Sequence, residues 1–289
     1  TTIIAGIAGP ATAATPAPLP ADPYVWLEEF TSPRAMDWVN AHNATAEKRL
    51  TADPRYKTLY EDALALGGAR DRIPQPSFLH GGIYNFWQDA DHLRGIWRKT
   101  TLESYRTAAP EWQAVLDIDA LGKAEGKSWV LKGVDCLRPA EKLCLISLSD
   151  GGEDAVTVRE FDLDTGAFVD AGFNLPRGKH RIEWQDENHL LVASEWTPGD
   201  LTPSGYPYIV KLLARGQALA DATEIYRGAK GDGGYGVSPG SVRDGKGNSL
   251  FFFVRPIDTF HHETFVLTPR GVERLAIPSK ADIVGMVDG

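Results

Sequence analysis

One stretch of the sequence has the residue types and spacing of a serine nucleophile. Residues 236–240 read Gly-Val-Ser-Pro-Gly, the pattern that holds a catalytic serine on a sharp turn between a strand and a helix. In that turn the backbone N–H of the residue after the serine helps to stabilise an oxyanion. Here that residue is Pro239, which has no N–H, and the glycine-rich, charged residues 241–248 do not predict a helix. We therefore interpret the match as a turn.

Residues 261–263, His-His-Glu, have the residue types of a metal site but not its spacing. Adjacent residues of a strand point to opposite faces, so His261 and His262 cannot bind one ion there, and we expect a surface loop. No carboxylate pair suits a glycosidase. Residues 231–234 lack the Lys-Ser/Thr ending of a phosphate-binding loop. The sequence therefore predicts no metal, no organic cofactor and no catalytic residue in this chain.

The two cysteines, Cys136 and Cys144, lie on either side of the turn-forming residues 138–142. Cysteines that face each other across a short hairpin can form a disulfide in an oxidising compartment. Two buried free thiols are the alternative. No histidine or further cysteine lies nearby at ligand spacing, which argues against a metal here.

Residues 1–20 differ in composition from the rest of the chain. Residues 1–9 are small or apolar, residues 11–14 offer small-residue cleavage sites, and residues 15–20 are rich in proline and alanine. This order is typical of the back half of a secretory signal that runs into a flexible linker. A disordered tail is the alternative. Together with the cysteine pair, the signal remnant predicts a periplasmic or secreted protein.

Charge and hydropathy argue against two classes of partner. The formal net charge of −9 argues against nucleic acid, because phosphate binding needs clustered lysine and arginine. No run approaches the roughly 18 apolar residues of a membrane span. With 289 residues, the chain is long enough for one or two domains with a sizeable core.

The elements that must position these residues begin with helices. Ser32 can cap a helix that has Pro33 at its first position, and residues 55–66 have the apolar spacing of a second helix that Gly67 ends. We expect a helical arm over residues 21–72.

From residue 77 the apolar period changes from helical to two, which predicts strands as far as the C-terminus. The strands form packets of four at about 77–118, 128–176, 180–227 and 235–278, and a fifth packet begins at 281–289. Four strands in every 45 or so residues are typical of a β-propeller blade. The predicted fold is therefore mostly β, with a partial propeller over residues 73–289. A β-sandwich is the alternative, but it does not explain the packets of four.

Several motifs of the sequence carry a family resemblance. They are Asp22-Pro-Tyr-Val-Trp-Leu-Glu, Cys144-Leu-Ile-Ser-Leu-Ser with the following Asp-Gly-Gly, Arg159-Glu-Phe-Asp and Gly172-Phe-Asn-Leu-Pro. With these motifs the chain resembles bacterial exported members of the prolyl oligopeptidase family of serine peptidases. The resemblance covers nearly the whole chain after residue 20.

The resemblance implies a seven-bladed ring, of which this chain supplies about four blades, and a catalytic α/β-hydrolase domain beyond residue 289. It also implies that the propeller admits short peptides to a Ser-His-Asp triad in that domain and excludes large proteins. Arg255 ends a predicted strand, where the family's propeller contacts peptide, so we expect it to bind substrate; an ordinary surface arginine is the alternative. A secreted, non-catalytic propeller that binds a partner is the second hypothesis for the whole chain.

Overall fold

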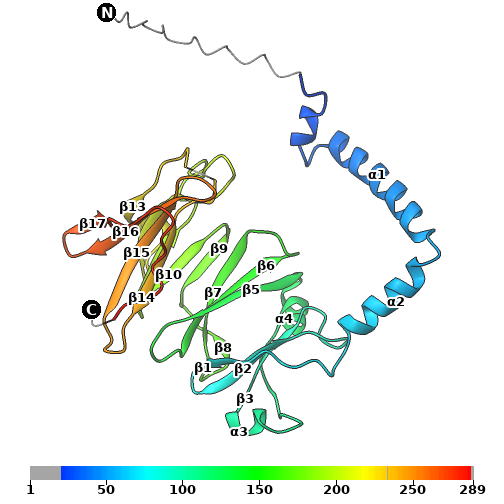
Figure 1. Ribbon diagram of the computed structural model, residues 1–289, viewed down its shortest axis with the longest axis horizontal. Coiled ribbons are helices and arrows are strands. Elements are labelled where there is room, and N and C mark those ends of the chain that lie inside the picture. The colour runs from blue at the N-terminus through cyan, green and yellow to red at the C-terminus, as the bar shows by residue number, and fades with distance from the viewer. Residues whose placement is uncertain (1–20, 233, 288–289) are drawn as a thin grey trace, which may run out of the picture. The chain divides into compact units, whose positions relative to one another are not determined.

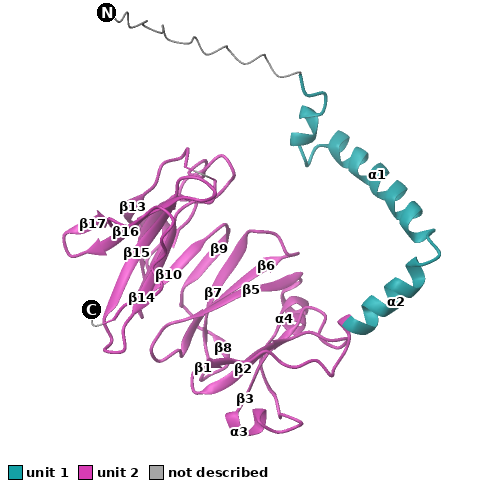
Figure 2. Ribbon diagram, viewed as in Figure 1, with its two compact units in different colours: residues 1–66 teal, residues 67–289 magenta. Residues whose placement is uncertain are grey.

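The computed structural model describes residues 21–232 and 234–287 and divides the chain into two units, residues 1–66 and residues 67–289 (Figures 1 and 2). The segment predicted as a signal remnant and linker, residues 1–20, lies outside the described residues. None of the helices in the described ranges is long and apolar enough to cross a membrane.

The first unit is the helical arm. It contains a 3-10 helix, Val25–Glu28, the helix α1, Pro33–Thr51, and most of the helix α2, Tyr56–Gly67. Ser32 caps α1 as predicted: its hydroxyl accepts a hydrogen bond of 3.2 Å from the backbone N–H of Ala35, and Pro33 is the first helical residue. Between residues 21 and 66, Ala35 has the only buried side chain. The arm therefore has no hydrophobic core of its own.

The second unit consists of four antiparallel sheets that follow one another along the chain. The first contains β1 (Ser77–Leu79), β2 (Gly82–Trp87), β3 (Ile96–Thr100) and β4 (Gln113–Asp117). The second contains β5 (Trp129–Cys136), β6 (Leu143–Asp150), β7 (Val156–Asp162), β8 (Ala167–Phe168) and β9 (Asn174–Gly178). The third contains β10 (Arg181–Asp186), β11 (His189–Ala193), β12 (Ile209–Ala214) and β13 (Thr223–Arg227). The fourth contains β14 (Ser238–Arg243), β15 (Ser249–Pro256), β16 (His262–Thr268) and β17 (Gly271–Arg274).

Each sheet packs face to face against the next through one of three apolar cores. The central strands are buried on both sides, so neighbouring residues serve different cores. Ile146 on β6 packs with Tyr84 and Trp97 of the first sheet, whereas Leu145 packs with Trp184 of the third. This explains the continuous apolar runs of the inner strands, since successive side chains alternate between faces. The stacked sheets, three of four strands and one of five, are those of a β-propeller, as the strand packets predict, and not of a sandwich.

Two differences from the predicted elements have clear local causes. Short helices, α3 (Leu102–Tyr105) and α4 (Ile118–Glu125), interrupt the region where we expected strands alone. Each has a side-chain cap: Thr101 accepts from the N–H of Ser104, and Asp117 accepts from the N–H of Ala120. The expected start of a fifth blade is also absent from residues 281–287, which form no strand, while residues 288 and 289 lie outside the described ranges. A strand needs a neighbour for its backbone hydrogen bonds.

Candidate functional site

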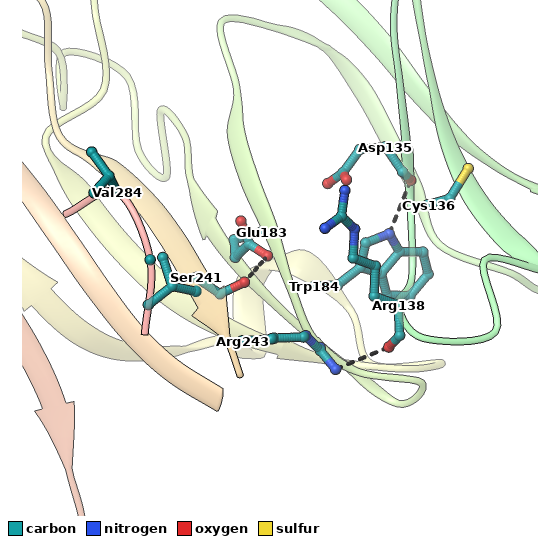
Figure 3. A pocket seen from close by; sticks show the side chains of 10 residues that line it. Asp135, Cys136, Arg138, Glu183, Trp184, Ser241, Arg243 and Val284 are labelled. Carbon is teal, nitrogen blue, oxygen red and sulfur yellow. Dashed lines mark hydrogen bonds between the residues drawn. The ribbon is translucent and has the colours of Figure 1, made fainter. Parts of the chain in front are cut away.

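The first strands of three successive sheets, β5, β10 and β14, line a cavity of about 410 Å³ (Figure 3). Each of these strands is the edge of its own sheet, and β10 lies beside β14. Three stacked blades share this cavity at their first strands, and we interpret this shared edge as the side that faces the central channel of a propeller. We call it the axial cavity.

Two carboxyl groups, Asp135 on β5 and Glu183 on β10, lie in the axial cavity. Burial raises the pKa of both groups, and the negative charge of Asp135 raises that of Glu183 further. Two groups lower the pKa of Glu183: the Ser241 hydroxyl, which donates a hydrogen bond of 2.9 Å to its carboxylate, and the positive charge of Arg243. The positive charge of Arg138 likewise lowers the pKa of Asp135. The cavity therefore presents two acids, and the ionisation of Glu183 depends on groups of the second and fourth sheets.

Hydrogen bonds between the sheets fix the wall of the axial cavity. The Trp184 indole donates to the carbonyl oxygen of Asp135 at 3.1 Å, and Arg243 donates to the carbonyl oxygen of Arg138 at 2.9 Å (Figure 3). A disulfide joins Cys136 to Cys144 beside this wall, linking β5 to β6. The second, third and fourth sheets together therefore hold the wall of the axial cavity in place.

The chemistry available in the axial cavity is recognition of polar groups. It offers carboxylates, a hydroxyl and guanidinium groups, but the Ser241 hydroxyl donates to a carboxylate and has no imidazole partner among the described residues. A serine nucleophile needs a base that accepts its proton and that is itself oriented by a third group. The arrangement can therefore bind and orient a polar ligand, and Ser241 has no such base among the described residues.

The residues that resemble a nucleophile motif are placed differently from our interpretation. Ser238 is not in a turn: it begins β14 and pairs with Val254 on β15. The turn lies before it, where Gly236 has a φ of 71° and a side chain would clash with the carbonyl oxygen of Pro207. Gly236 is therefore needed because the backbone passes close to the loop between β11 and β12, and this close approach explains the glycine without catalysis.

The two adjacent histidines also differ from the predicted loop. His262 is the first residue of β16, and its Nε2 lies 3.1 Å from the carbonyl oxygen of Ala281, while His261 bonds to Asp258 at 2.8 Å. Within residues 21–232 and 234–287, no group of three or more histidine, cysteine, aspartate or glutamate side chains is arranged to hold a metal.

Arg255, the predicted peptide contact, is engaged inside the protein. Its guanidinium makes two hydrogen bonds to Asp232, of 2.6 and 2.8 Å, and lies 3.5 Å from Glu263. The Arg255 guanidinium holds the pKa of Asp232 below its usual range. The pair ties β15 to the loop that enters the fourth blade. Peptide contact through Arg255 stays a prediction.

A serine–histidine contact that the sequence did not suggest occurs in the third blade. Nδ1 of His180 lies 3.0 Å from the Ser194 hydroxyl, and its Nε2 lies 2.7 Å from the carbonyl oxygen of Pro176. The Pro176 carbonyl can only accept, so Nε2 donates to it. Burial lowers the pKa of His180 and favours the neutral ring, whose Nδ1 then accepts a hydrogen bond from the Ser194 hydroxyl. The partner that orients the ring is a carbonyl and not a carboxylate. His180 and Ser194 are 14 residues apart in the sequence and come together because β10 pairs with β11. The sequence alone therefore gives no sign of this contact.

The family model for the N-terminal beta-propeller domain of prolyl oligopeptidase matches residues 15–255. The chain belongs to the prolyl oligopeptidase family. An uncharacterized peptidase of Sinorhizobium fredii is 50% identical over 244 residues, which are 84% of this chain and 33% of that protein. An uncharacterized peptidase of Rickettsia prowazekii is 27% identical over 274 residues, which are 90% of this chain and 38% of that protein.

Solved structures agree with the prolyl oligopeptidase assignment. A post-proline cleaving enzyme from Rickettsia typhi superimposes with a TM-score of 0.83 and 26% identity, over 90% of this chain and 39% of that enzyme. Oligopeptidase B from Leishmania major, at 14% identity and a TM-score of 0.66, shares the fold over 89% of this chain and 35% of that protein. The chain spans between a third and two fifths of the length of the relatives it matches. The predicted family and the propeller fold are confirmed.

Proposed function

We propose that this chain is the propeller part of an exported serine peptidase and that it controls which peptides reach a Ser-His-Asp hydrolase domain beyond residue 289. The polar axial cavity carries the proposal, because it lies at the inner edges of three blades and is lined by groups that bind a polar chain. A walled opening of this kind admits a short extended peptide and rejects a folded protein by size. Likeness to the post-proline cleaving enzyme of Rickettsia typhi supports cleavage after proline.

The test uses the longer protein that carries this propeller. We expect it to cleave a short proline-containing peptide but not the same sequence inserted in a surface loop of a folded protein. Labelling by a fluorophosphonate counts the active serines and confirms that both assays contain the same active enzyme. Equal cleavage of the free and the inserted sequence would refute size selection.

Two controls separate this function from the alternative. The fluorophosphonate should label neither the 289-residue chain nor its Ser194→Ala variant, because the His180–Ser194 contact has no orienting carboxylate. If the longer protein is also unlabelled, the second hypothesis, a secreted propeller that binds a partner without catalysis, gains support. Export is checked by recovery from the periplasm with Cys136 and Cys144 unreactive to alkylation until they are reduced.

A further inference from the structure

A second polar cavity, distinct from the axial cavity, lies on the first blade and also measures about 410 Å³. Arg98 on β3 is its central group. The guanidinium carbon lies 4.4 Å from the ring centre of Trp87 and 4.4 Å from that of Trp112, so the guanidinium is held between two indoles. Its Nε donates to the side-chain oxygen of Asn85 at 3.0 Å. These three neighbours fix the plane of the guanidinium.

The outer edge of the Arg98 guanidinium is without a partner. Neither terminal nitrogen makes a hydrogen bond to any residue in the described ranges, although Arg98 lines the cavity. Burial lowers the pKa of Arg98, but an arginine keeps its charge in a protein. A partly buried guanidinium that is held in a fixed plane beside a cavity, with terminal donors that no protein group uses, is suited to binding an anion.

Asp89, an acid in the wall of this cavity, does not fill this role. The Asp89 carboxylate accepts from the Trp87 indole at 3.0 Å and from the backbone N–H groups of Asp91 and His92 at 2.9 Å each. These bonds hold the pKa of Asp89 at about 2. Asp89 is therefore hydrogen-bonded within its own turn. Its charge opposes the effect of burial on the pKa of Arg98, but it leaves the terminal donors of Arg98 without a hydrogen-bond partner.

The other two arginines of this cavity already have partners. Three arginines, Arg70, Arg72 and Arg98, and two aspartates, Asp71 and Asp89, line it. Arg72 is occupied by the carbonyl oxygens of Ala69 and Gln88, and Arg70 is paired with Asp91. Pro74 and residues 108–110, Ala-Ala-Pro, form the apolar part of the wall.

We propose that this cavity binds a carboxylate, held by both terminal nitrogens of Arg98 between Trp87 and Trp112. The planar fork of a guanidinium matches the two oxygens of a carboxylate, and the small apolar wall suits a short side chain beside it. A free small acid or peptide end can supply this carboxylate, and so can an acidic side chain from the rest of a longer protein. The two sources are separable by experiment.

The probe is N-acetyl-alanine, and N-acetyl-alaninamide, which has no carboxylate, is its matched control. Saturation-transfer NMR with the 289-residue chain should show binding of the acid and none of the amide. Arg98→Lys should weaken binding by about tenfold, because a lysine cannot form the paired hydrogen bonds. Arg94→Lys is the control variant, since Arg94 lies outside this cavity and bonds to Ser128. Thermal unfolding of each variant shows whether it is folded.

Repeating the titration on the longer protein identifies the source of the carboxylate. Binding of the acid by both proteins indicates a free ligand, and binding by the 289-residue chain alone indicates that an acidic side chain of the longer protein occupies the cavity. Equal transfer to acid and amide, unchanged affinity in a folded Arg98→Lys variant, or no saturable binding by either protein would overturn the proposal.

Discussion

Arg255 and Arg98 show at the residue scale how partners decide what an arginine does. Both lie on strands and both are partly buried, but the donors of Arg255 meet Asp232 and Glu263 while the terminal donors of Arg98 meet no described residue. Their sequence neighbourhoods do not separate the two cases. Asp232 is 23 residues from Arg255, and it reaches Arg255 only because the loop before β14 folds back on the fourth blade.

Removing the charge of Asp232 should destabilise the fourth blade. The Asp232 side chain is 10% exposed and that of Arg255 is 27% exposed, so Asp232→Asn leaves a poorly solvated cation with Glu263 as its remaining acid. We expect the free energy of unfolding to fall by about 1–3 kcal/mol. Urea unfolding at neutral pH measures this change.

The exposed ion pair of Glu224 and Arg227 is the matched control for this substitution. It also has two hydrogen bonds, of 2.9 and 2.6 Å, but its side chains are 40% and 48% exposed. Glu224→Gln should therefore change the free energy of unfolding by less than about 0.5–1 kcal/mol. Equal losses for the two substitutions would show that burial is not what makes the Asp232 pair important.

At the scale of elements, a hairpin turn of the first blade is tied to two turns of the second. Nδ1 of His80 lies 2.9 Å from the carbonyl oxygen of Ala140, and its Nε2 lies 2.8 Å from the Asp164 carboxylate. The Ala140 carbonyl and then Asp164 raise the pKa of His80, against burial and the charge of Lys99. Both partners are acceptors, so only the doubly protonated ring satisfies them together.

The contact made by His80 should make the seam between the first two blades pH-dependent. The pKa of His80 is higher in the folded chain than its unfolded value of about 6.5. Its contribution to stability is therefore complete below that unfolded value and is lost as the pH rises through the folded pKa. We expect His80→Gln to destabilise the chain by about 0.5–1.5 kcal/mol in acid and by less in alkali.

Denaturant unfolding on both sides of the His80 transition measures this difference. Other charges face the ring: Lys142 lies 3.0 Å from Asp164 and 3.5 Å from Asp162, and the Glu141 carboxylate accepts from the backbone N–H of His80. The Asp164→Asn variant, which keeps these charges and the Ala140 carbonyl, should lose part of the pH dependence. A His80→Gln effect of the same size at both pH values would contradict the assignment.

Local chemistry explains how much of the elements could be predicted. The Ser32 cap, the proline after it and the two-residue period of the strands act over a few residues, so the arm and all four sheets were predictable. The helix α4 was missed because the apolar Ile118, Leu121 and their neighbours continue a strand-like run. The Glu183–Ser241 bond of the axial cavity joins residues 58 apart and exists only once two blades stack. No pattern along the chain contains it.

The whole molecule has apolar surface that its described residues do not cover. Leu250, Phe252, Val254 and Val266 share one face of the fourth sheet, are partly exposed, and belong to none of the three cores. The opposite face, with Phe253 and Phe265, packs against the third sheet. A sheet face of this composition is the kind that the next blade of a ring covers, and without that cover it favours association.

We therefore expect the 289-residue chain to associate as its concentration rises and expect Phe252→Ser to reduce that association. The Phe252 side chain lies across Gly240 on the uncovered face, so serine removes a large apolar area without opening any of the three cores. Sedimentation velocity over a series of concentrations measures the change. Leu93→Ser is the control, because Leu93 is 72% exposed in the β2–β3 turn, away from this face. A parent chain that stays monomeric at all concentrations, or equal effects of the two substitutions, would show that the fourth sheet does not drive association.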